Sequence, residues 1–434
     1  MDRSSEISGF YKLPIAARRQ KLREWGELTD AEIAAYEFPP GFDPALVDRM
    51  IENVVGVFPI PLGIATNFRV NGTDYLVPMA IEEPSVVAAA SNSAKVARTA
   101  GGFRAMTTPP IMIGQVQILD VADPSAARLR ILAERETLLE QANAKDPMLV
   151  KFGGGARELE VRILPSPRGT MLVVHLMVDA RDAGGMNAVN TMCEALAPTL
   201  ARLAGGRSVL RIISNLAVLR LARAWATFPA AQLATPTMTG PQVVEAVLDA
   251  YTLAAVDPFR CATHNKGIMN GISAVVIATG NDFRAIESGA HTYAAFRAQD
   301  GGVVRPLTTY EKDAQGDLVG TIELPVPVGL VGGATAVHPT AKANVKLLGV
   351  KHASELAQVI AAVGLAQNFG ALRALATEGI QRGHMELHAR NIAAMAGARP
   401  DEVDRLVARM VEEHAIRIDR AQELLSESRA RPRA

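Results

Sequence analysis

The alternation of hydrophobic and polar positions predicts short helices, a hairpin and one long helix in the first hundred residues. Up to about Gly56 the pattern is that of short helical stretches. Residues 67–77 alternate around Asn71-Gly72, the dipeptide most typical of a two-residue hairpin turn. The segment Val86–Ala100 is apolar on more than one face and ends at Gly101-Gly102. Because such a helix is normally buried, we expect a long central helix here.

Between Ile111 and Asn215 the pattern changes to alternating strands and helices. Their order, β-α-β-β-α-β, is that of the ferredoxin-like unit. We therefore expect a ferredoxin-like module inserted between two helical segments. The predicted strands cover residues 111–119, 158–164, 171–178 and 209–214, and the predicted helices cover residues 124–144 and 187–203.

The rest of the chain has a mainly helical pattern. Helices are predicted over residues 216–226, 241–256, 353–376 and 385–395, and from Gly267, Asp282 and about Asp401. A polar loop is predicted over residues 257–266 and a hairpin over residues 303–324. The predicted fold is α+β: a discontinuous helical large domain (residues 1–109 and 216–376), the inserted module (residues 110–215) and a helical C-terminal segment (residues 377–434).

Composition and charge exclude several classes of protein. The 434 residues are 49% hydrophobic, which is enough to bury several cores and excludes a disordered scaffold. The 45 Lys and Arg residues are balanced by 45 Asp and Glu residues, so nothing favours a nucleic-acid partner. There is neither a signal-peptide pattern in residues 1–20 nor an uninterrupted apolar run of about 18 residues, so no membrane span is expected. Only Cys193 and Cys261 are present, which favours a reducing compartment, the cytoplasm.

The clearest candidate for a ligand site is the segment in which an apolar strand runs into Asp182-Ala-Gly-Gly-Met-Asn187 and then a helix. Glycines at such a turn let backbone N–H groups approach a phosphate, and the helix N-terminus adds the positive end of its dipole. The segment is not the G-x-G-x-x-G fingerprint. A plain tight turn with Asn187 as the helix cap remains the alternative.

Two other segments place ionisable groups next to apolar ones. Glu82 and Glu83 precede the long helix, and one of them is expected to point inward; the alternative is a carboxylate that only interacts with the helix dipole. Lys266 lies in a polar stretch just ahead of an apolar segment. A desolvated lysine there would need a carboxylate such as Asp282 to remain charged, and the alternative is a lysine that extends to solvent.

Histidines near the C-terminus resemble a metal motif without matching it. His384 and His388 are four residues apart and share a helix face, but Glu386 falls on a different face, so the H-E-x-x-H arrangement is missed and no metal is expected. We instead favour one functional histidine, His384, after a segment containing Gly379 and Gly383.

Six motifs, taken together and in this order, resemble those of hydroxymethylglutaryl-coenzyme A (HMG-CoA) reductase, most strongly the soluble bacterial class II. The resemblance extends from about residue 50 to residue 420. The motifs are Glu52-Asn-Val-Val-Gly56, Glu82-Glu83-Pro-Ser85, Asp182-Ala-Gly-Gly-Met-Asn187, Thr263-His-Asn-Lys266-Gly-Ile-Met-Asn270-Gly, Gly280-Asn-Asp282 and Gly383-His384-Met.

The resemblance implies a role for each matching residue. The implied catalytic set is Glu83 as proton donor and acceptor, Lys266 as the group that stabilises the oxyanion, Asp282 as the residue that tunes both, and His384 as the proton donor to the coenzyme A thiolate. The implied substrate contacts are Ser85, Arg260, Asn270 and Asn215. The implied cofactor contacts are Asp182, Ala183, Gly184, Gly185, Met186 and Asn187, with Asp146 near the adenosine ribose. Gly184 and Met186 depart from the usual D-A-M-G-A-N and bear on the shape of the nicotinamide pocket.

The implied reaction is a four-electron interconversion of HMG-CoA with mevalonate and coenzyme A, through mevaldehyde and with two nicotinamide cofactors. A carboxylate at Asp146 would repel a 2′-phosphate, which favours NAD(H) over NADP(H); the alternative is that Asp146 only caps a helix before Pro147. Glu83, Lys266 and Asp282 are expected to form a coupled group that shares protons.

The resemblance also implies a homodimer with shared active sites, which could build larger assemblies. Because one cofactor must leave before the second enters, an opening element is needed, and the candidate is a mobile C-terminal lid (residues 377–434) that has Gly379 and Gly383 as hinges and carries His384. A different class stays open from the residues alone. A coenzyme A-dependent acyltransferase or lyase would use Cys261 or His384 and no nicotinamide cofactor.

Overall fold

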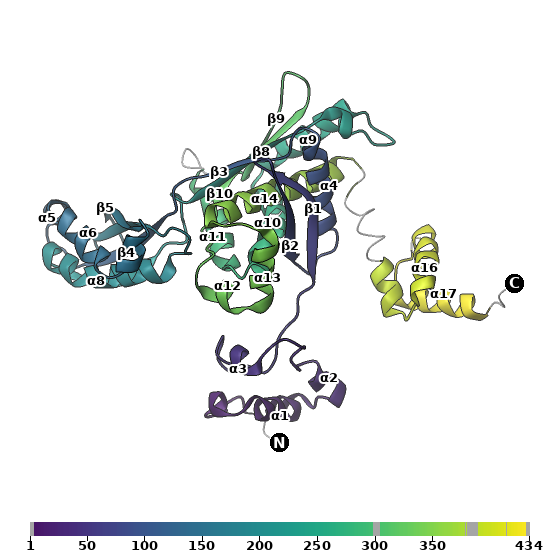
Figure 1. Cartoon of the computed structure of the whole chain (residues 1–434), viewed down its shortest axis with the longest axis horizontal. Helices are drawn as coiled ribbons and strands as arrows, with labels where there is room; N and C mark the ends of the chain where they lie inside the picture. Colours follow the sequence, from purple (N-terminus) through teal and green to yellow (C-terminus); the bar gives the residue numbers. More distant parts are fainter. Residues whose placement is uncertain (1–3, 298–303, 378, 380–388, 414, 431–434) are drawn as a thin grey trace. The chain divides into compact units, whose positions relative to one another are not determined.

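The computed structural model describes residues 4–297, 304–377, 379, 389–413 and 415–430 (Figure 1). The chain forms two compact units, Met1–Pro61 and Leu62–Ala434. The hydrophobic pattern did not indicate this division, because it grouped residues 1–109 together.

The first unit consists of short helices joined by a buried arginine. Arg18 donates hydrogen bonds to the Asp48 carboxylate at 2.5 Å and to the carbonyl oxygens of Val54 and Tyr11 at 2.9 and 2.8 Å. One guanidinium therefore holds three distant parts of the unit together. The elements are η1 (Phe10–Lys12), α1 (Ile15–Gly26), α2 (Asp30–Ala34) and α3 (Pro44–Val47).

A four-stranded antiparallel sheet and a hairpin frame the large domain. The sheet has the order β3-β8-β10-β9, with β3 (Arg104–Thr107), β8 (Leu221–Phe228), β10 (Leu318–Pro325) and β9 (Thr308–Lys312). The hairpin pairs β1 (Leu62–Val70) with β2 (Thr73–Ala80). Its turn residues Asn71 and Gly72 both have positive φ, 51° and 86°, which confirms the hairpin predicted from that dipeptide. The predicted hairpin within residues 303–324 is also confirmed, as β9 and β10.

Helices pack around this frame. They are α4 (Val86–Arg98), η2 (Ala230–Gln232), α9 (Gly240–Val256), α10 (Pro258–Ala278), α11 (Phe283–Phe296), α12 (Gly333–Val337), α13 (Pro339–Leu348) and α14 (Ala353–Ala376). Helix α14 packs against α10, α4 and α9 and against β3, β8 and β10. It is therefore the helix at the centre of the large domain.

The segment that we expected to be the buried central helix, residues 86–100, is instead amphipathic. Helix α4 buries one face and leaves Ala88, Asn92 and Lys95 exposed. The helix that is buried on nearly all sides is α14. By length and composition alone α14 could also cross a membrane, but two-thirds of its most apolar window is buried inside the structure, as in the core helix of a folded domain.

Helices α14 and α10 are in close contact through glycines. A Cβ on Gly364 of α14 would lie 2.7 Å from Ile272 Cδ1, and a Cβ on Gly271 of α10 would lie 2.8 Å from Gln367 Cβ. Both distances are below van der Waals contact, so each helix presents a glycine where the other helix approaches most closely.

The predicted ferredoxin-like module is confirmed element by element. Its sheet has the order β5-β6-β4-β7 and is antiparallel throughout. One predicted helix, residues 124–144, is divided at Glu134 into α5 and α6. The elements are β4 (Ile111–Leu119), α5 (Pro124–Ala133), α6 (Arg135–Asn143), α7 (Pro147–Lys151), β5 (Gly155–Leu164), β6 (Met171–Asp179), α8 (Met186–Ala204) and β7 (Arg207–Ile213). The module has its own hydrophobic core, distinct from that of the large domain.

Two predictions after the module are wrong. Residues 216–226 were expected to be helical, but residues 221–228 form strand β8. Ala222, Ala224 and Ala226 are buried, and the residues between them are more exposed. This alternation at every second residue is typical of a strand. The polar stretch 257–266 was expected to be a loop, but it is the first half of α10, which Asp257 caps and Pro258 begins.

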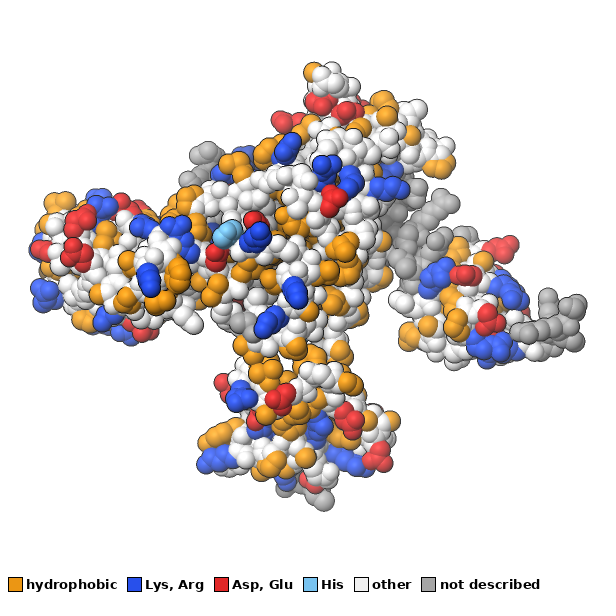
Figure 2. All heavy atoms as spheres, viewed as in Figure 1, with side chains coloured by type: hydrophobic (Ala, Val, Ile, Leu, Met, Phe, Trp, Pro, Cys, Tyr) orange, Lys and Arg blue, Asp and Glu red, His pale blue; other side chains and the backbone are white. Residues whose placement is uncertain are grey.

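The described C-terminal residues form helices around a third apolar core. Residues 389–395 are helical, and the predicted helix from Asp401 is two helices, α16 (Pro400–Glu412) and α17 (Ile418–Ala430). Over the face in Figure 2, charged side chains of both signs are interspersed, in keeping with a net charge of zero.

Candidate active site

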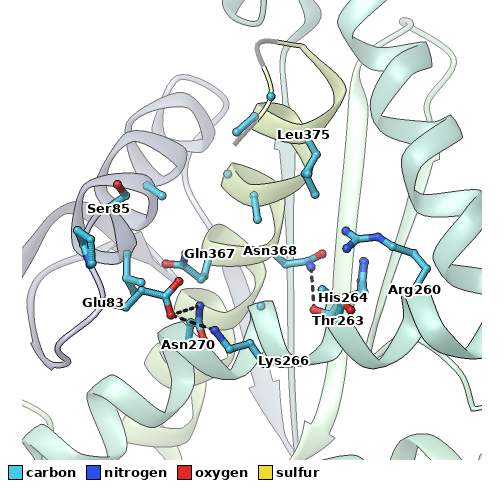
Figure 3. Close-up of a pocket in the computed structure, with 18 residues that line it drawn as sticks. Glu83, Ser85, Arg260, Thr263, His264, Lys266, Asn270, Gln367, Asn368 and Leu375 are labelled. Carbon is cyan, nitrogen blue, oxygen red and sulfur yellow. Dashed lines mark hydrogen bonds and ion pairs between the residues drawn. The ribbon is translucent and has the colours of Figure 1, made fainter. Parts of the chain in front are cut away.

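A cavity of about 290 Å³ lies in the large domain between the start of α4, the first half of α10 and the second half of α14 (Figure 3). One side is polar, with Glu83, Lys266 and Asn270 directed toward one another. The lining also includes the apolar side chains of Ala371, Ala374 and Leu375 of α14. The cavity therefore combines an ionisable pair with a surface suited to an aliphatic ligand.

An ion pair between α10 and the loop before α4 is the chemical centre of this cavity. The Nζ atom of Lys266 lies 2.9 Å from Oε2 of Glu83, and Asn270 donates to the same oxygen at 3.3 Å. Lys266 and Asn270 are four residues apart and therefore lie on one face of α10. Of the two adjacent glutamates, Glu83 is the one that points inward, whereas Glu82 is exposed.

The pair is open to solvent on one side. The Lys266 side chain is 61% exposed and the Glu83 side chain is 34% exposed. An ion pair this exposed contributes little to stability, on the order of 0–1 kcal/mol. Stability therefore does not account for the pairing of these two side chains in the cavity.

Of the predicted substrate contacts, Ser85, Arg260 and Asn270 line this cavity. Ser85 has φ 72°, a left-handed conformation that reverses the chain between Glu83 and α4. Arg260 follows the Asp257 cap on the first turn of α10. The motifs around residues 83 and 266, distant in sequence, thus meet at one place.

The structure does not bring Asp282 or Asn215 to this cavity. Asp282 caps α11, where it accepts hydrogen bonds from the backbone N–H groups of Arg284 and Ala285 and from the Arg284 side chain. Burial raises its pKa, but these hydrogen bonds and the Arg284 charge outweigh burial and lower it overall. Asn215 is exposed beside α11, with its carbonyl oxygen near Gly289. His384 lies outside the described residues.

His264, which we had not proposed as a site residue, lines the cavity from α10. It is 1% exposed, and its Nε2 atom is 2.6 Å from Oγ1 of Thr308, which in turn donates to Asn368. Burial, and secondarily the Arg260 charge, lower the pKa of His264 to about 3. His264 is thus a neutral part of the buried wall behind Lys266 at physiological pH.

A second, larger cavity of about 880 Å³ lies beside the glycine turn of the module. Gly185 has φ 93° and is the N-cap of α8, which has no side-chain cap. A Cβ at Gly185 would lie 2.9 Å from Ala180 Cβ and 3.0 Å from Met112 Cγ. An uncapped helix N-terminus behind a turn that only glycine fits is suited to a phosphate. The alternative with Asn187 as the cap is wrong, since Asn187 lies within the helix and is exposed.

The turn is attached to the N-terminus of α14. The Asp182 carboxylate accepts a hydrogen bond from the Ala353 N–H at 2.7 Å and lies 3.1 Å from His352 Nδ1. The bond and charge of Asp182 raise the pKa of His352. Asp182 and Ala183 line the cavity, whereas Gly184, Gly185 and Met186 follow in the turn and the first residue of α8.

Asp146 caps α7 by accepting a hydrogen bond from the Leu149 N–H at 2.9 Å. Leu149 and Phe152, on and just after the same helix, line the larger cavity. Asp146 is therefore a helix cap, as the alternative interpretation of the sequence predicted. The helix that it caps contributes Leu149 to the lining of the larger cavity.

Comparisons with known proteins agree with this geometry. Residues 14–389 match the family model of hydroxymethylglutaryl-coenzyme A reductase. The chain belongs to the HMG-CoA reductase family. It is 58% identical to an HMG-CoA reductase of Archaeoglobus fulgidus over 98% of this chain and 95% of that one. It is 32% identical to a probable HMG-CoA reductase of Borreliella burgdorferi over 87% and 84% of the two chains.

Among solved structures, the class II HMG-CoA reductase of Streptococcus pneumoniae, bound to NADPH in open conformations, is similar with a TM-score of 0.75 and 41% identity. The alignment covers 96% of this chain and all of that one. The predicted family, class and enzyme type are confirmed: an oxidoreductase that reduces HMG-CoA to mevalonate. The acyltransferase or lyase alternative is thereby set aside.

We predict that His264 makes the protein less stable in acid, because its buried imidazole does not take up a proton in the folded state. Its folded pKa of about 3 lies below the value of about 6.5 for an unfolded histidine. As the pH falls below 6.5, only the unfolded chain binds the proton, so the free energy of unfolding falls, by roughly 2–3 kcal/mol at pH 4.5.

Urea unfolding at pH 7 and pH 4.5 measures the free energy of unfolding of the wild type and of His264→Gln. The wild type should lose more stability on acidification than the variant does. His352→Gln is the control, because a raised pKa has the opposite sign and cannot reduce the acid loss. Equal losses in the wild type and His264→Gln would contradict the prediction.

Proposed function

We propose that the Lys266–Glu83 pair carries out both reduction steps, from HMG-CoA to mevaldehyde and from mevaldehyde to mevalonate, with two NAD(P)H consumed. The observation that carries this proposal is the 2.9 Å contact in the small cavity. A bound nicotinamide supplies a hydride. A carbonyl that accepts a hydride becomes an oxyanion, and the Lys266 ammonium is the fixed cation that stabilises it, an effect of about 3 kcal/mol or more.

Proton delivery is the task of Glu83 and His384 in this proposal. After the first reduction the hemithioacetal collapses, and the C–S bond breaks with its electron pair on the coenzyme A sulfur. His384 donates a proton to that thiolate, for which an imidazole is a competent acid. Glu83 donates the proton that the second alkoxide takes, and accepts it in the reverse direction. Ser85, Arg260 and Asn270 hold the HMG part, supported by their places around the pair.

Glu83→Gln removes the proton and keeps the shape of the side chain. We expect kcat for both mevaldehyde reduction and mevalonate oxidation to fall by roughly 10²- to 10⁴-fold, as when a general acid is lost. The change in absorbance at 340 nm measures both. Glu82→Gln is the matched control, because the neighbouring carboxylate is exposed and does not line the cavity. Full activity of Glu83→Gln in both directions would refute the role of Glu83.

We propose further that Asp282 and Asn215 complete the site from the second chain of a homodimer. In one chain, Lys266 and the end of α10 at Ala278 are twelve residues apart, about 18 Å along the helix, and Asp282 follows that end. Asp282 of the same chain caps α11 and does not line the cavity that holds Lys266. A partner chain can place its own Asp282, Asn215 and module against the cavity, so the coupled proton-sharing group would span two subunits.

Mixing two inactive variants tests this arrangement. We expect Lys266→Ala and Asp282→Ala to be inactive alone. After unfolding and refolding together, half of the dimers are mixed, and one of the two sites in each has both groups, which restores about a quarter of the wild-type activity. If the two residues act within one chain, every site lacks one group and no activity returns, which would refute the shared site. Mixing either variant with itself is the control.

We propose that the cofactor binds with its phosphates at the turn from Asp182 to Asn187, where Gly185 and the uncapped α8 N-terminus lie. NAD(H) is the proposed preference, with NADP(H) the alternative, because Asp146 stands on the helix that lines the same cavity. The C-terminal segment from residue 377 is the proposed lid over the exposed pair. A cytoplasmic location remains part of the proposal, supported by two free, buried cysteines.

The cofactor preference predicts a higher kcat/KM with NADH than with NADPH. Asp146→Asn should narrow the difference by raising kcat/KM for NADPH, since the negative charge that repels a 2′-phosphate is removed while the side chain keeps a capping oxygen. Steady-state kinetics with each cofactor measures this. Asp123→Asn, at the N-cap of α5 in the same module, is the control. Equal kcat/KM values in the wild type would contradict the preference.

A further inference from the structure

A buried arginine joins the glycine turn of the module to the large domain. Arg220, just before β8, is only 6% exposed and lines the larger cavity. Its guanidinium donates to the carbonyl oxygens of Ala183 at 3.0 Å and Gly184 at 3.4 Å, both in the turn, and to Val328 at 2.6 Å in the large domain. A longer contact of 3.4 Å reaches the carbonyl of Arg181.

This cation is buried with backbone partners in place of a carboxylate. Among the residues that the structure describes, no acidic side chain forms an ion pair with Arg220. Burial lowers its pKa to about 10, while the charges of Asp179 and Asp182 act in the opposite direction. The side chain therefore remains charged at neutral pH. Burying a cation without a paired anion is costly, so its position calls for an explanation beyond packing.

The contacts prepare the turn for an anion in two ways. Carbonyl oxygens carry partial negative charge, and Arg220 draws those of Ala183 and Gly184 toward itself. Because each peptide unit is planar, these two contacts fix the orientation of the peptides that follow Ala183 and Gly184, so the turn is held in one conformation. The guanidinium also places a fixed positive charge beside the turn, where a dinucleotide would bring its phosphates.

We propose that Arg220 is a positioning residue for the dinucleotide: it fixes the turn at residues 181–185 in the conformation that accepts the phosphates and supplies the positive charge behind it. This inference rests on the proposed cofactor site at that turn. Only a planar fork with five N–H groups can reach carbonyls on both sides, so lysine is not an equivalent residue here.

The test measures NADH binding to the full-length enzyme by fluorescence titration, together with steady-state kinetics. For Arg220→Gln we expect the Kd and KM for NADH to rise roughly tenfold or more, the effect of losing hydrogen bonds from a charged donor. The KM for HMG-CoA, and kcat at saturating NADH, should stay within twofold. Arg220→Lys keeps the charge without the fork, and we expect at least a threefold rise in Kd. Arg223→Lys, a partly exposed arginine further along β8, is the matched control and should change neither constant.

A merely structural role predicts a different result. If Arg220 only stabilises the fold, the unfolding temperature and kcat fall while the Kd for NADH stays within twofold, and this outcome would overturn the proposal. Should Arg220→Gln fail to fold, Arg220→Lys decides by the same criterion. Gly185→Ala separates the two proposals. If it leaves NADH binding unchanged, the cofactor site itself is wrong; if it weakens binding while the Arg220 variants do not, only the role of Arg220 is wrong.

Discussion

The fixed rise of the α-helix determines how this enzyme can assemble its active site. Helix α14 begins at the module turn, where Asp182 binds the Ala353 N–H, and reaches the small cavity only at Gln367, fourteen residues or about 21 Å further along. The proposed cofactor turn and the Lys266–Glu83 pair of one chain therefore lie beside different parts of α14, and in the proposed dimer a second chain would bring a cofactor to the pair.

The ion pair between Lys266 and Glu83 is accessible to solvent. Lys266 and Glu83 stand at an open edge of the large domain, where a second chain and a lid can approach them. The proposed reaction needs access for two dinucleotides and a coenzyme A substrate in each turnover, which a pair sealed inside one chain would not have. The structure is consistent with a site whose low dielectric is established only when other elements close over it.

The sequence predicts the module better than it predicts the large domain, for physical reasons. In the module, strands rich in Val and Ile alternate with helices whose limits carry clear signals, such as Pro124 at the start of α5 and Gly205 after α8, so periodicity and turn signals agree. In the large domain, the alanines of residues 221–228 suit a helix, and the alternation of buried and more exposed residues that marks strand β8 is clear only from the packing of the folded chain. The stretch from Asp257 was predicted to be a loop because it is rich in hydrogen-bonding side chains. Asp257 and Pro258 are nevertheless typical of the start of a helix.

Some residues of the candidate site could be predicted from the sequence, and others are evident only from the structure. Glu83, Lys266, Ser85, Arg260 and Asn270 could be named from motifs, and they meet in one cavity. His264 and Arg220 could not be recognised, because their importance lies in burial and in contacts with Thr308 and Val328, which are distant in the chain. Asp182 was assigned to the cofactor, yet its attachment to α14 depends on a contact across 171 positions that no local pattern encodes.

The glycine contacts between α10 and α14 limit how the sequence of this family can vary. Gly271 faces Gln367, and Gly364 faces Ile272, with no space for a methyl group at either glycine. A larger residue at one of them requires a simultaneous change on the opposite helix, or the two helices separate. Because α10 carries Lys266 and α14 forms the apolar wall of the cavity, such a separation would widen the cavity. Substitutions here should therefore be accepted in pairs, and the pairing would be visible as covariation between positions on the two helices.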